Sequence, residues 1–322
     1  MDSVQTWVDS LMMSNHGLAI TSAVKYLPIL FEFAEFVAKK PDEMIADARA
    51  SLRSPESEYK YPRKLRDWFK DLNSKGFEWN VSVKKLRIIK SFFRRNEIKL
   101  DYEVPKRVSS PYPFAPEKAL LREAFLSLER GSPWRSWILL QSQSGLSEVD
   151  ILNLRADLEN SDKYAGPVFE SIKSQVKKGS KFVHIVIPRQ KTSKITITFI
   201  GIEAISLLEF YKNGQLFPWK QPAHNSSSTI TRGFEKFQEI LNERRFTSHT
   251  LRKYFQTTLE TEHVNSNWIK LMMGHSRGAV EGAYSVPPIP KMQEEYERVY
   301  PALRLFDEKY LGRLGTLSRA SL

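Results

Sequence analysis

Residues 249–260 read "HTLRKYFQTTLE", and residues 272–285 read "MMGHSRGAVEGAYS". Both stretches have the character of helices, yet four residues that can perform chemistry stand at fixed offsets in them. His249 and Arg252 are three residues apart, so on a helix they share one face. His275 follows Gly274 at a predicted helix end, and Tyr284 lies nine residues further on. These offsets raise the question of whether the four residues form one site.

Their chemistry suits a phosphodiester. A guanidinium can hold two non-bridging phosphate oxygens, and imidazoles can donate to the same oxygens or move protons. A phenol can act as a nucleophile that forms a covalent intermediate. Lys191, in the polar stretch "RQKTS", adds an ammonium that could protonate a departing oxygen. Each residue alone occurs often by chance, so only their order and spacing together indicate a site.

The surrounding sequence predicts a mainly α fold with one small β-sheet. Residues 183–187 and 195–199 alternate apolar and other residues around a polar turn, which predicts a β-hairpin. Most of the remaining sequence has helical spacing, including residues 115–129, 132–145, 146–159, 202–214, 227–245, 249–264 and 265–276. Met292, Tyr296, Val299 and Leu303 predict a further amphipathic helix in the tail.

Two domains are predicted, because 322 residues exceed one average domain. The first hundred residues read as helices, with an interruption at Pro28, a helix start at Pro41 and a helix end at Gly76. The proline-rich residues 101–113 predict a linker. The expected organisation is therefore a helical domain at 1–100, a linker at 101–113, a second domain at 114–290, and a C-terminal helix and tail at 291–322.

The net charge of +12 favours a polyanionic partner, either nucleic acid or an anionic membrane. Residues 81–107 hold nine lysines or arginines and only three acids. A helix at 82–96 would place Val83, Leu86, Ile89, Phe92 and Phe93 on a core. Six basic residues would form the opposite face, which is either solvated or a DNA-binding surface: Lys84, Lys85, Arg87, Lys90, Arg94 and Arg95.

Two further features narrow the class of protein. The chain has no cysteine, which removes disulfides, thiolate zinc sites and cysteine nucleophiles and fits a reducing compartment. No apolar run reaches the roughly 18 residues of a membrane span, and the N-terminus does not read as a signal peptide. A protein acting in the cytoplasm is expected.

The ordered set "SHTLRKYF…WIKLMMGHSRGAVEGAYSVP" resembles the C-terminal signature of the tyrosine recombinases, or phage integrases, most closely those of archaeal chromosomes and viruses. The resemblance covers residues 112–300, and residues 1–100 match the family's helical core-binding domain more loosely. It implies that Tyr284 attacks a DNA phosphate and forms a 3′-phosphotyrosyl link, with Arg252, His249 and His275 around that phosphate. It also implies that Lys191 is the general acid, with Lys194, Lys181 and Lys178 as weaker candidates.

The resemblance further implies how the protein would work. The core-binding and catalytic domains would form a clamp around double-stranded DNA, near the nucleoid and without a cofactor. The assembly would be a tetramer on DNA and a monomer or weak oligomer when free, with the tail helix docked on its own domain or on a neighbouring protomer.

One position departs from the family pattern. The family has a first catalytic arginine in Gly-x-Arg-x-x-(Glu/Asp)-x-x-x-Leu, and this chain has "SGLSEVDILNL", with Ser147 at the arginine position. Losing one preorganised donor slows such chemistry by about 10²–10³-fold. Arg155 and Arg135 are weak substitutes. The serine is an engineered change, a mark of a copy that binds DNA without cutting it, or a feature of a slow enzyme. The alternatives to a recombinase are therefore an architectural DNA-binding protein and a type IB topoisomerase-like enzyme.

Overall fold

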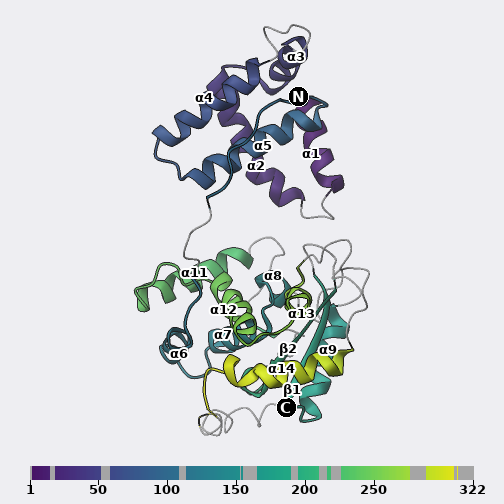
Figure 1. Cartoon of the computed structure of the whole chain (residues 1–322), viewed down its shortest axis with the longest axis vertical. Helices are drawn as coiled ribbons and strands as arrows, with labels where there is room; N and C mark the ends of the chain where they lie inside the picture. The colour runs from purple at the N-terminus through teal and green to yellow at the C-terminus, as the bar shows by residue number, and fades with distance from the viewer. Residues whose placement is uncertain are drawn as a thin grey trace. The chain divides into compact units, whose positions relative to one another are not determined.

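The structure is a computed structural model that describes residues 2–14, 19–51, 59–108, 114–152, 154, 165–189, 195–209, 216–218, 226–275, 288–307 and 310. The chain divides into two compact units, Met1–Pro113 and Phe114–Leu322. The fold is mainly helical, with one two-stranded antiparallel sheet among the described residues, as the sequence predicted. Figure 1 shows the helices of both units and the sheet of the second unit.

The first unit is a set of helices around an aromatic core. The helices are α1 (Asp2–Ser14), α2 (Ala19–Val37), α3 (Pro41–Ser51), α4 (Lys60–Ser74) and α5 (Trp79–Arg95). The rings of Phe33 on α2 and Trp68 on α4 lie 5.0 Å apart, and those of Trp7 on α1 and Phe92 on α5 lie 5.6 Å apart. All four side chains are buried, so these contacts join α1 to α5 and α2 to α4 within one core.

The predicted interruption at Pro28 is wrong, because α2 runs through it. A proline inside a helix removes the hydrogen bond to the carbonyl four residues earlier. Here Pro28 is exposed and the Val24 side chain is 64% exposed, so this side of the helix faces solvent, where water can satisfy the freed carbonyl. The opposite side packs Leu30 and Phe33 into the core. Tertiary packing therefore keeps the helix continuous.

The second unit surrounds a central buried helix. Its elements are α6 (Lys118–Leu126), α7 (Pro133–Ser144), α8 (Glu148–Leu152), α9 (Ala165–Lys177), β1 (Phe182–Pro188), β2 (Ile195–Gly201), α10 (Ile202–Ile205), α11 (Ser226–Ile240), α12 (Ser248–Thr261), α13 (Ser266–Met272) and α14 (Ile289–Leu303). Helix α7 packs against α6, α10, α12 and β2. Every residue of α7 from Arg135 to Ser144 is buried. This helix is therefore the scaffold on which the other elements are placed.

The predicted β-hairpin is confirmed, with β1 and β2 antiparallel and Phe182 opposite Gly201. Val183, Ile185 and Ile187 are buried in alternation, as predicted. The second strand differs, because every residue after the 59%-exposed Ile195 is buried. Helices α7, α13 and α14 all pack against β2, so both of its faces are covered and alternation is lost.

One predicted helix is shorter than expected, and another helix was missed. Residues 202–214 were expected to form one helix, but α10 ends at Ile205, and the Leu207 carbonyl accepts a hydrogen bond from Ser136 Oγ on α7 (2.6 Å) instead. Helix α9 was not predicted, although Val168, Phe169 and Ile172 are buried at helical spacing. It packs beside β1 (Figure 1).

The tail helix α14 packs on its own unit. The four predicted apolar positions, Met292, Tyr296, Val299 and Leu303, are all buried. The Tyr296 hydroxyl donates to the Gln143 carbonyl of α7 (3.1 Å), and α14 contacts both strands and α12. The apolar stripe is thus already covered, and it is not a free surface for a neighbouring protomer. Within the described part of the chain, no helix has the length and apolar character needed to cross a membrane.

Candidate active site

Helix α12 is held in place by the C-terminal end of α7. The Ser248 hydroxyl donates to Gln141 Oε1 (2.9 Å), while Thr250 Oγ1 accepts from the Thr247 backbone N–H (3.0 Å). The residue that caps the N-terminus of α12 is Thr247. Gly145, which follows α7, has φ of +63°, and a Cβ there would lie 2.3 Å from the Phe255 ring of α12. The close approach of the two segments therefore requires a glycine.

Arg252 is the buried centre of the candidate site. It is only 4% exposed, and its guanidinium donates to the carbonyls of Gly145 and Met273, which follow α7 and α13 respectively. Desolvation, together with the like charge of Arg189, lowers the pKa of Arg252 to about 10, and Asp150 partly offsets this. The guanidinium thus joins two helix ends while keeping its positive charge at neutral pH.

His275 joins Arg252 from the end of α13. The Arg252 Nη2 lies 3.0 Å from His275 Nε2. A guanidinium can only donate, so Nε2 accepts, the ring is neutral, and its proton is on Nδ1. Partial desolvation and the like charges of Arg252, Arg189 and His249 lower the pKa of His275 to about 4. The ring is thus suited to donate from Nδ1 to an anion at neutral pH.

Gly274 allows His275 to reach this position. Its φ is +61°, and a Cβ there would lie 2.3 Å from Thr196 Oγ1 and 2.8 Å from Arg189 Cδ. The His275 backbone N–H donates to the Lys270 carbonyl (2.8 Å) and closes the end of α13. The glycine of the Gly-His pair is therefore a steric requirement of the turn.

His249 lies one helical turn before Arg252 and is exposed. Partial desolvation and the like charges of Lys253 and Arg252 lower the pKa of His249. Because His249 also contributes to the lowered pKa of His275, the two imidazoles share one electrostatic environment. The structure therefore brings together Arg252, His249 and His275, three of the five residues predicted to be catalytic.

The other two predicted catalytic residues, Tyr284 and Lys191, lie outside the described residues, as do Lys194 and Arg155. The weaker candidates Lys178 and Lys181 precede β1, at the end of the hairpin opposite to its turn. The seven residues of β1 span about 20 Å at 3.3 Å per residue. Because Arg189, at the turn end, contacts Gly274, these two lysines are far from the site.

Ser147 stands where the resemblance expects an arginine, and its hydroxyl donates to Asp150 Oδ2 (2.6 Å) on α8. The same carboxylate oxygen lies 3.5 Å from Nε of Arg189, the residue after β1. Arg135 does not reach this region, because its guanidinium donates to the Leu128 carbonyl and lies over the Phe125 ring.

Arg189 was missed by the sequence analysis, which placed it within the polar turn stretch. No motif marks it, and only its position two residues before Lys191 hints at a role. The described residues contain no group of three or more His, Asp or Glu side chains that could hold a metal ion. The groups that the described part of the site offers a ligand are therefore cations and hydrogen-bond donors.

A second functional surface was predicted on α5. Its expected core residues, Val83, Leu86, Ile89, Phe92 and Phe93, are all buried, as predicted. Of the six basic residues, Lys84, Arg87 and Arg94 are exposed. At about 100° per residue they lie within an arc of about 80° on the helix, so they share one face. We call these three residues the α5 basic face.

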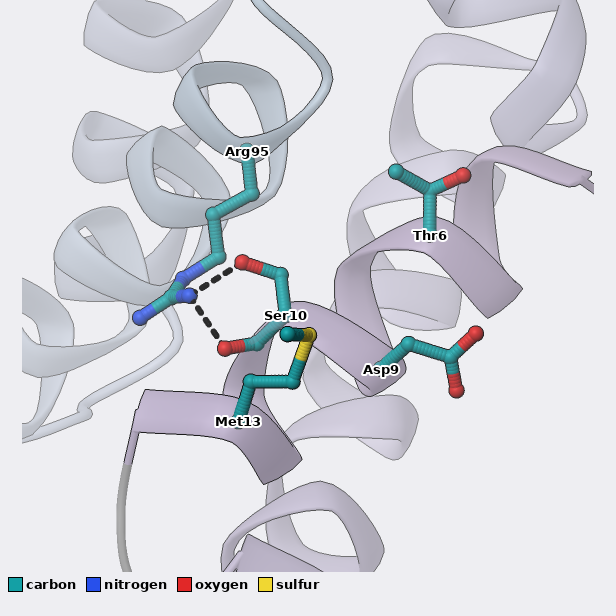
Figure 2. Close-up of a pocket in the computed structure, with 5 residues that line it drawn as sticks. All are labelled: Thr6, Asp9, Ser10, Met13 and Arg95. Carbon is teal, nitrogen blue, oxygen red and sulfur yellow. Dashed lines mark hydrogen bonds between the residues drawn. The ribbon is translucent and has the colours of Figure 1, made fainter.

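The other three basic residues of α5 are engaged by the fold. Lys85 is buried, with its ammonium 2.7 Å from both carboxylate oxygens of Glu32 and 4.0 Å from the centre of the Phe77 ring. Lys90 donates to the Tyr102 carbonyl. Figure 2 shows Arg95 turned toward α1, where its guanidinium donates to the hydroxyl and the carbonyl of Ser10. The expectation that all six form one open face is therefore wrong for Lys85, and Lys90 and Arg95 are only partly accessible.

Helix α4 carries exposed cations that the sequence analysis did not single out. Arg63, Arg66 and Lys70 are exposed at spacings of three and four residues, which place them on one side of the helix. The signal was present in "YPRKLRDWFK", where the apolar residues Tyr61, Leu65 and Trp68 take the buried side. The first unit thus exposes basic residues on two helices that pack against each other.

Comparison with known proteins yields structural similarity only. No protein-family model and no curated protein sequence matches the chain. Among solved structures, the XerA recombinase is 15% identical, with a TM-score of 0.37 and 99% of each chain covered.

Two further similar structures contain DNA. The XerH site-specific recombinase bound to its difH substrate is 16% identical, with a TM-score of 0.46 and coverage of 80% of this chain and 70% of that one. The Tn1549 transposon integrase in complex with circular intermediate DNA is 16% identical, with a TM-score of 0.43 and coverage of 72% and 84%. The similar structures are thus recombinases and integrases, but at these identities and scores the function must be argued from the residues of this chain.

Proposed function

We propose that the protein is a site-specific DNA recombinase that cleaves and rejoins strands through Tyr284. The observation that carries the proposal is the buried guanidinium of Arg252, joined by His275 Nε2 at 3.0 Å and preceded by His249 on the same helix. These groups stabilise negative charge on a phosphate oxygen, because fixed donors in a partly dry site need little reorganisation. The proposed nucleophile follows His275 by nine residues.

The reaction would proceed by transesterification. The Tyr284 oxygen would attack phosphorus while its proton passes to the neutral imidazole of His249, whose pKa is lowered. A phosphotyrosyl bond to the 3′ phosphate forms, and the bond from phosphorus to the 5′ oxygen breaks. Lys191 would give its proton to the departing 5′ oxygen, while Arg252 and Nδ1–H of His275 hold the non-bridging oxygens. Attack by a 5′ hydroxyl reverses the step and releases the tyrosine, so strand rejoining restores the starting bond types.

The two units would divide the work. The first unit would act as a core-binding domain that contacts the DNA backbone through the α5 basic face, and the second would hold the catalytic residues, so that both clamp the duplex. We further propose an archaeal-type enzyme that assembles as a tetramer on DNA in the cytoplasm, near the nucleoid. Because the stripe of α14 is covered by its own unit, protomer contacts would use other surfaces.

A covalent-adduct assay tests the proposal. Duplexes that the protein retains from a random library supply the target sequence, and a nick placed near the cleavage point prevents religation. We expect wild-type protein to form a protein–DNA adduct that survives denaturing electrophoresis and that Tyr284→Phe does not form. Absence of an adduct with both the wild type and Ser147→Arg would contradict the proposal.

A second candidate, an architectural DNA-binding protein on the same scaffold, is favoured by one observation. Ser147 brings no charge to the site, and its hydroxyl is engaged with Asp150. This candidate predicts target-specific binding without an adduct, even in Ser147→Arg. A topoisomerase-like enzyme would instead relax supercoiled plasmid without site preference, and a relaxation assay on unrelated plasmid separates it from a recombinase.

A further inference from the structure

The described part of the active site has more positive charge than its own acids neutralise. Arg189 lowers the pKa of Arg252, and Arg252, Arg189 and His249 each lower the pKa of His275. Among the described residues, the carboxylate that approaches these guanidinium groups is Asp150. Asp150 is 4% exposed. Placing two guanidinium groups near one buried carboxylate is unfavourable unless another anion completes the site.

Arg189 is held so that part of its guanidinium stays free. Its Nη1 donates to the Gly274 carbonyl (3.1 Å), and its Nε lies 3.5 Å from Asp150 Oδ2 without a hydrogen bond. No described residue accepts a hydrogen bond from Nη2. The side chain is 15% exposed and lies against Gly274, so its orientation is restricted. A restricted guanidinium with an unused donor is preorganised for an anionic ligand.

The position of Arg189 relates directly to Ser147. The Ser147 hydroxyl and Arg189 Nε approach the same oxygen, Oδ2 of Asp150, at 2.6 Å and 3.5 Å. Arg189 therefore reaches, from the end of β1, the same carboxylate that the side chain at position 147 contacts from just before α8.

We infer that Arg189 supplies the second guanidinium of the phosphate-binding site in place of the residue at position 147, with Asp150 as the positioning residue. The ligand class is a phosphodiester of the DNA backbone, and the inference rests on the proposed function for its catalytic part. Coupling between the groups agrees with this placement, since Arg189 lowers the pKa of both Arg252 and His275.

The catalytic test is a cycle of variants in the adduct assay. We expect Arg189→Gln to slow adduct formation by about 10²-fold and Arg189→Lys to slow it less. Ser147→Arg should change the wild-type rate by less than about threefold but recover about tenfold or more in the Arg189→Gln background, because the two positions serve one role. The matched control, Arg298→Gln, removes an exposed guanidinium paired with Glu295 and should leave the rate unchanged. Equal effects of Ser147→Arg in both backgrounds would overturn the inference.

A binding test needs neither target DNA nor catalysis. Inorganic phosphate is titrated into the free protein while the ring signals of His249 and His275 are followed by NMR. We expect phosphate to shift both signals and to raise the pKa of His275 from about 4, with at least about tenfold weaker binding in Arg189→Gln and unchanged binding in Arg298→Gln. Phosphate binding that does not depend on Arg189 would overturn the inference, whether or not an adduct forms.

The two tests separate failure of the inference from failure of the proposed function. If phosphate binding depends on Arg189 but no adduct forms, even in Ser147→Arg, the inferred anion site is supported and the proposed recombinase function is rejected. If the adduct forms at the same rate in wild type and in Arg189→Gln, the proposed recombinase function is supported and the inferred role of Arg189 is rejected. Thermal unfolding of each variant identifies any loss that comes from misfolding.

Discussion

The cations of α5 and the cations around Arg252 differ in what surrounds them. On α5 the basic residues are either exposed, as in the α5 basic face, or bound to a specific internal partner, as Lys85 is to Glu32. In the candidate site the guanidinium groups of Arg252 and Arg189 are largely buried and are held by carbonyl oxygens, while the imidazoles of His249 and His275 beside them are exposed. Exposed cations supply long-range attraction to DNA, whereas a cluster of buried cations supplies a defined binding point for one phosphate.

The largest expected effect is on the rate of adduct formation, when the buried guanidinium of Arg252 is removed. We expect Arg252→Gln to reduce the rate of adduct formation by at least about 10³-fold, because it removes a charged donor from the centre of the site. Single-turnover kinetics on the nicked duplex measure this rate. Binding of the same duplex should weaken far less, since most affinity comes from exposed cations. A variant that loses binding and cleavage equally would show that Arg252 serves general DNA binding.

The exposed face should behave in the opposite way. The triple variant Lys84→Gln, Arg87→Gln, Arg94→Gln should weaken binding to duplex DNA and reduce the slope of log affinity against log salt by on the order of 2 to 3, because each phosphate contact contributes about 0.9. Fluorescence anisotropy at several salt concentrations measures both quantities.

A matched triple variant controls for net charge. Lys75, Arg245 and Arg298 are exposed and each pairs with an acidic neighbour, so their replacement by glutamine makes the same change in charge away from the α5 basic face. We expect it to change the slope by less than about 1. Equal slopes in the two triple variants would mean that only net charge matters and that the α5 basic face has no special role.

The same comparison explains what the sequence could predict. His249, Arg252 and His275 were found because their relation depends on local helix geometry and a Gly-His turn. The core positions of α5 were found for the same reason. The engagement of Lys85 and Arg95 was not predictable, because Glu32 and Ser10 are 53 and 85 residues away in sequence. Arg189 was missed because its site forms only when the hairpin meets Gly274 and Asp150.

The predictions at Pro28 and at residues 202–214 were wrong for a related reason. A local rule predicted a helix break at Pro28 and a continuous helix after β2. Packing of the first unit keeps α2 continuous through Pro28. After β2 the helix ends early, and the Leu207 carbonyl accepts a hydrogen bond from Ser136 instead. Local propensity therefore predicts most elements here, and tertiary contacts decide where they end.

A smaller effect distinguishes two adjacent lysines of α5. We expect Lys85→Met to lower the free energy of unfolding by about 1 kcal/mol, because it leaves the Glu32 carboxylate without its buried partner, while solvent around Glu32 limits the loss. Lys84→Met should stay within about 0.5 kcal/mol, as expected for an exposed position. Urea denaturation measures both values. Equal destabilisation by the two variants would show that the pair with Glu32 contributes nothing measurable.

The smallest expected effect concerns pH. The pKa of His275 is lowered to about 4 in the folded protein, against about 6.5 for an unperturbed imidazole. The unfolded chain therefore binds a proton that the folded one refuses, so the stability associated with the neutral ring is present above pH 6.5 and is lost as pH falls toward about 4. Urea denaturation at pH 7, 5.5 and 4.5 should show a shallower decline in His275→Asn than in wild type. Because His275 is exposed, solvent screens part of the repulsion and the difference should be modest.

Arg189→Gln should make the decline of stability with falling pH similarly shallow, since removing that positive charge raises the pKa of His275. The surface change Arg298→Gln should not. If the decline in stability were the same in wild type, His275→Asn and Arg189→Gln, the charges around Arg252 would not act on this imidazole. Arg189 would then have a structural partner only, as Lys85 has on α5.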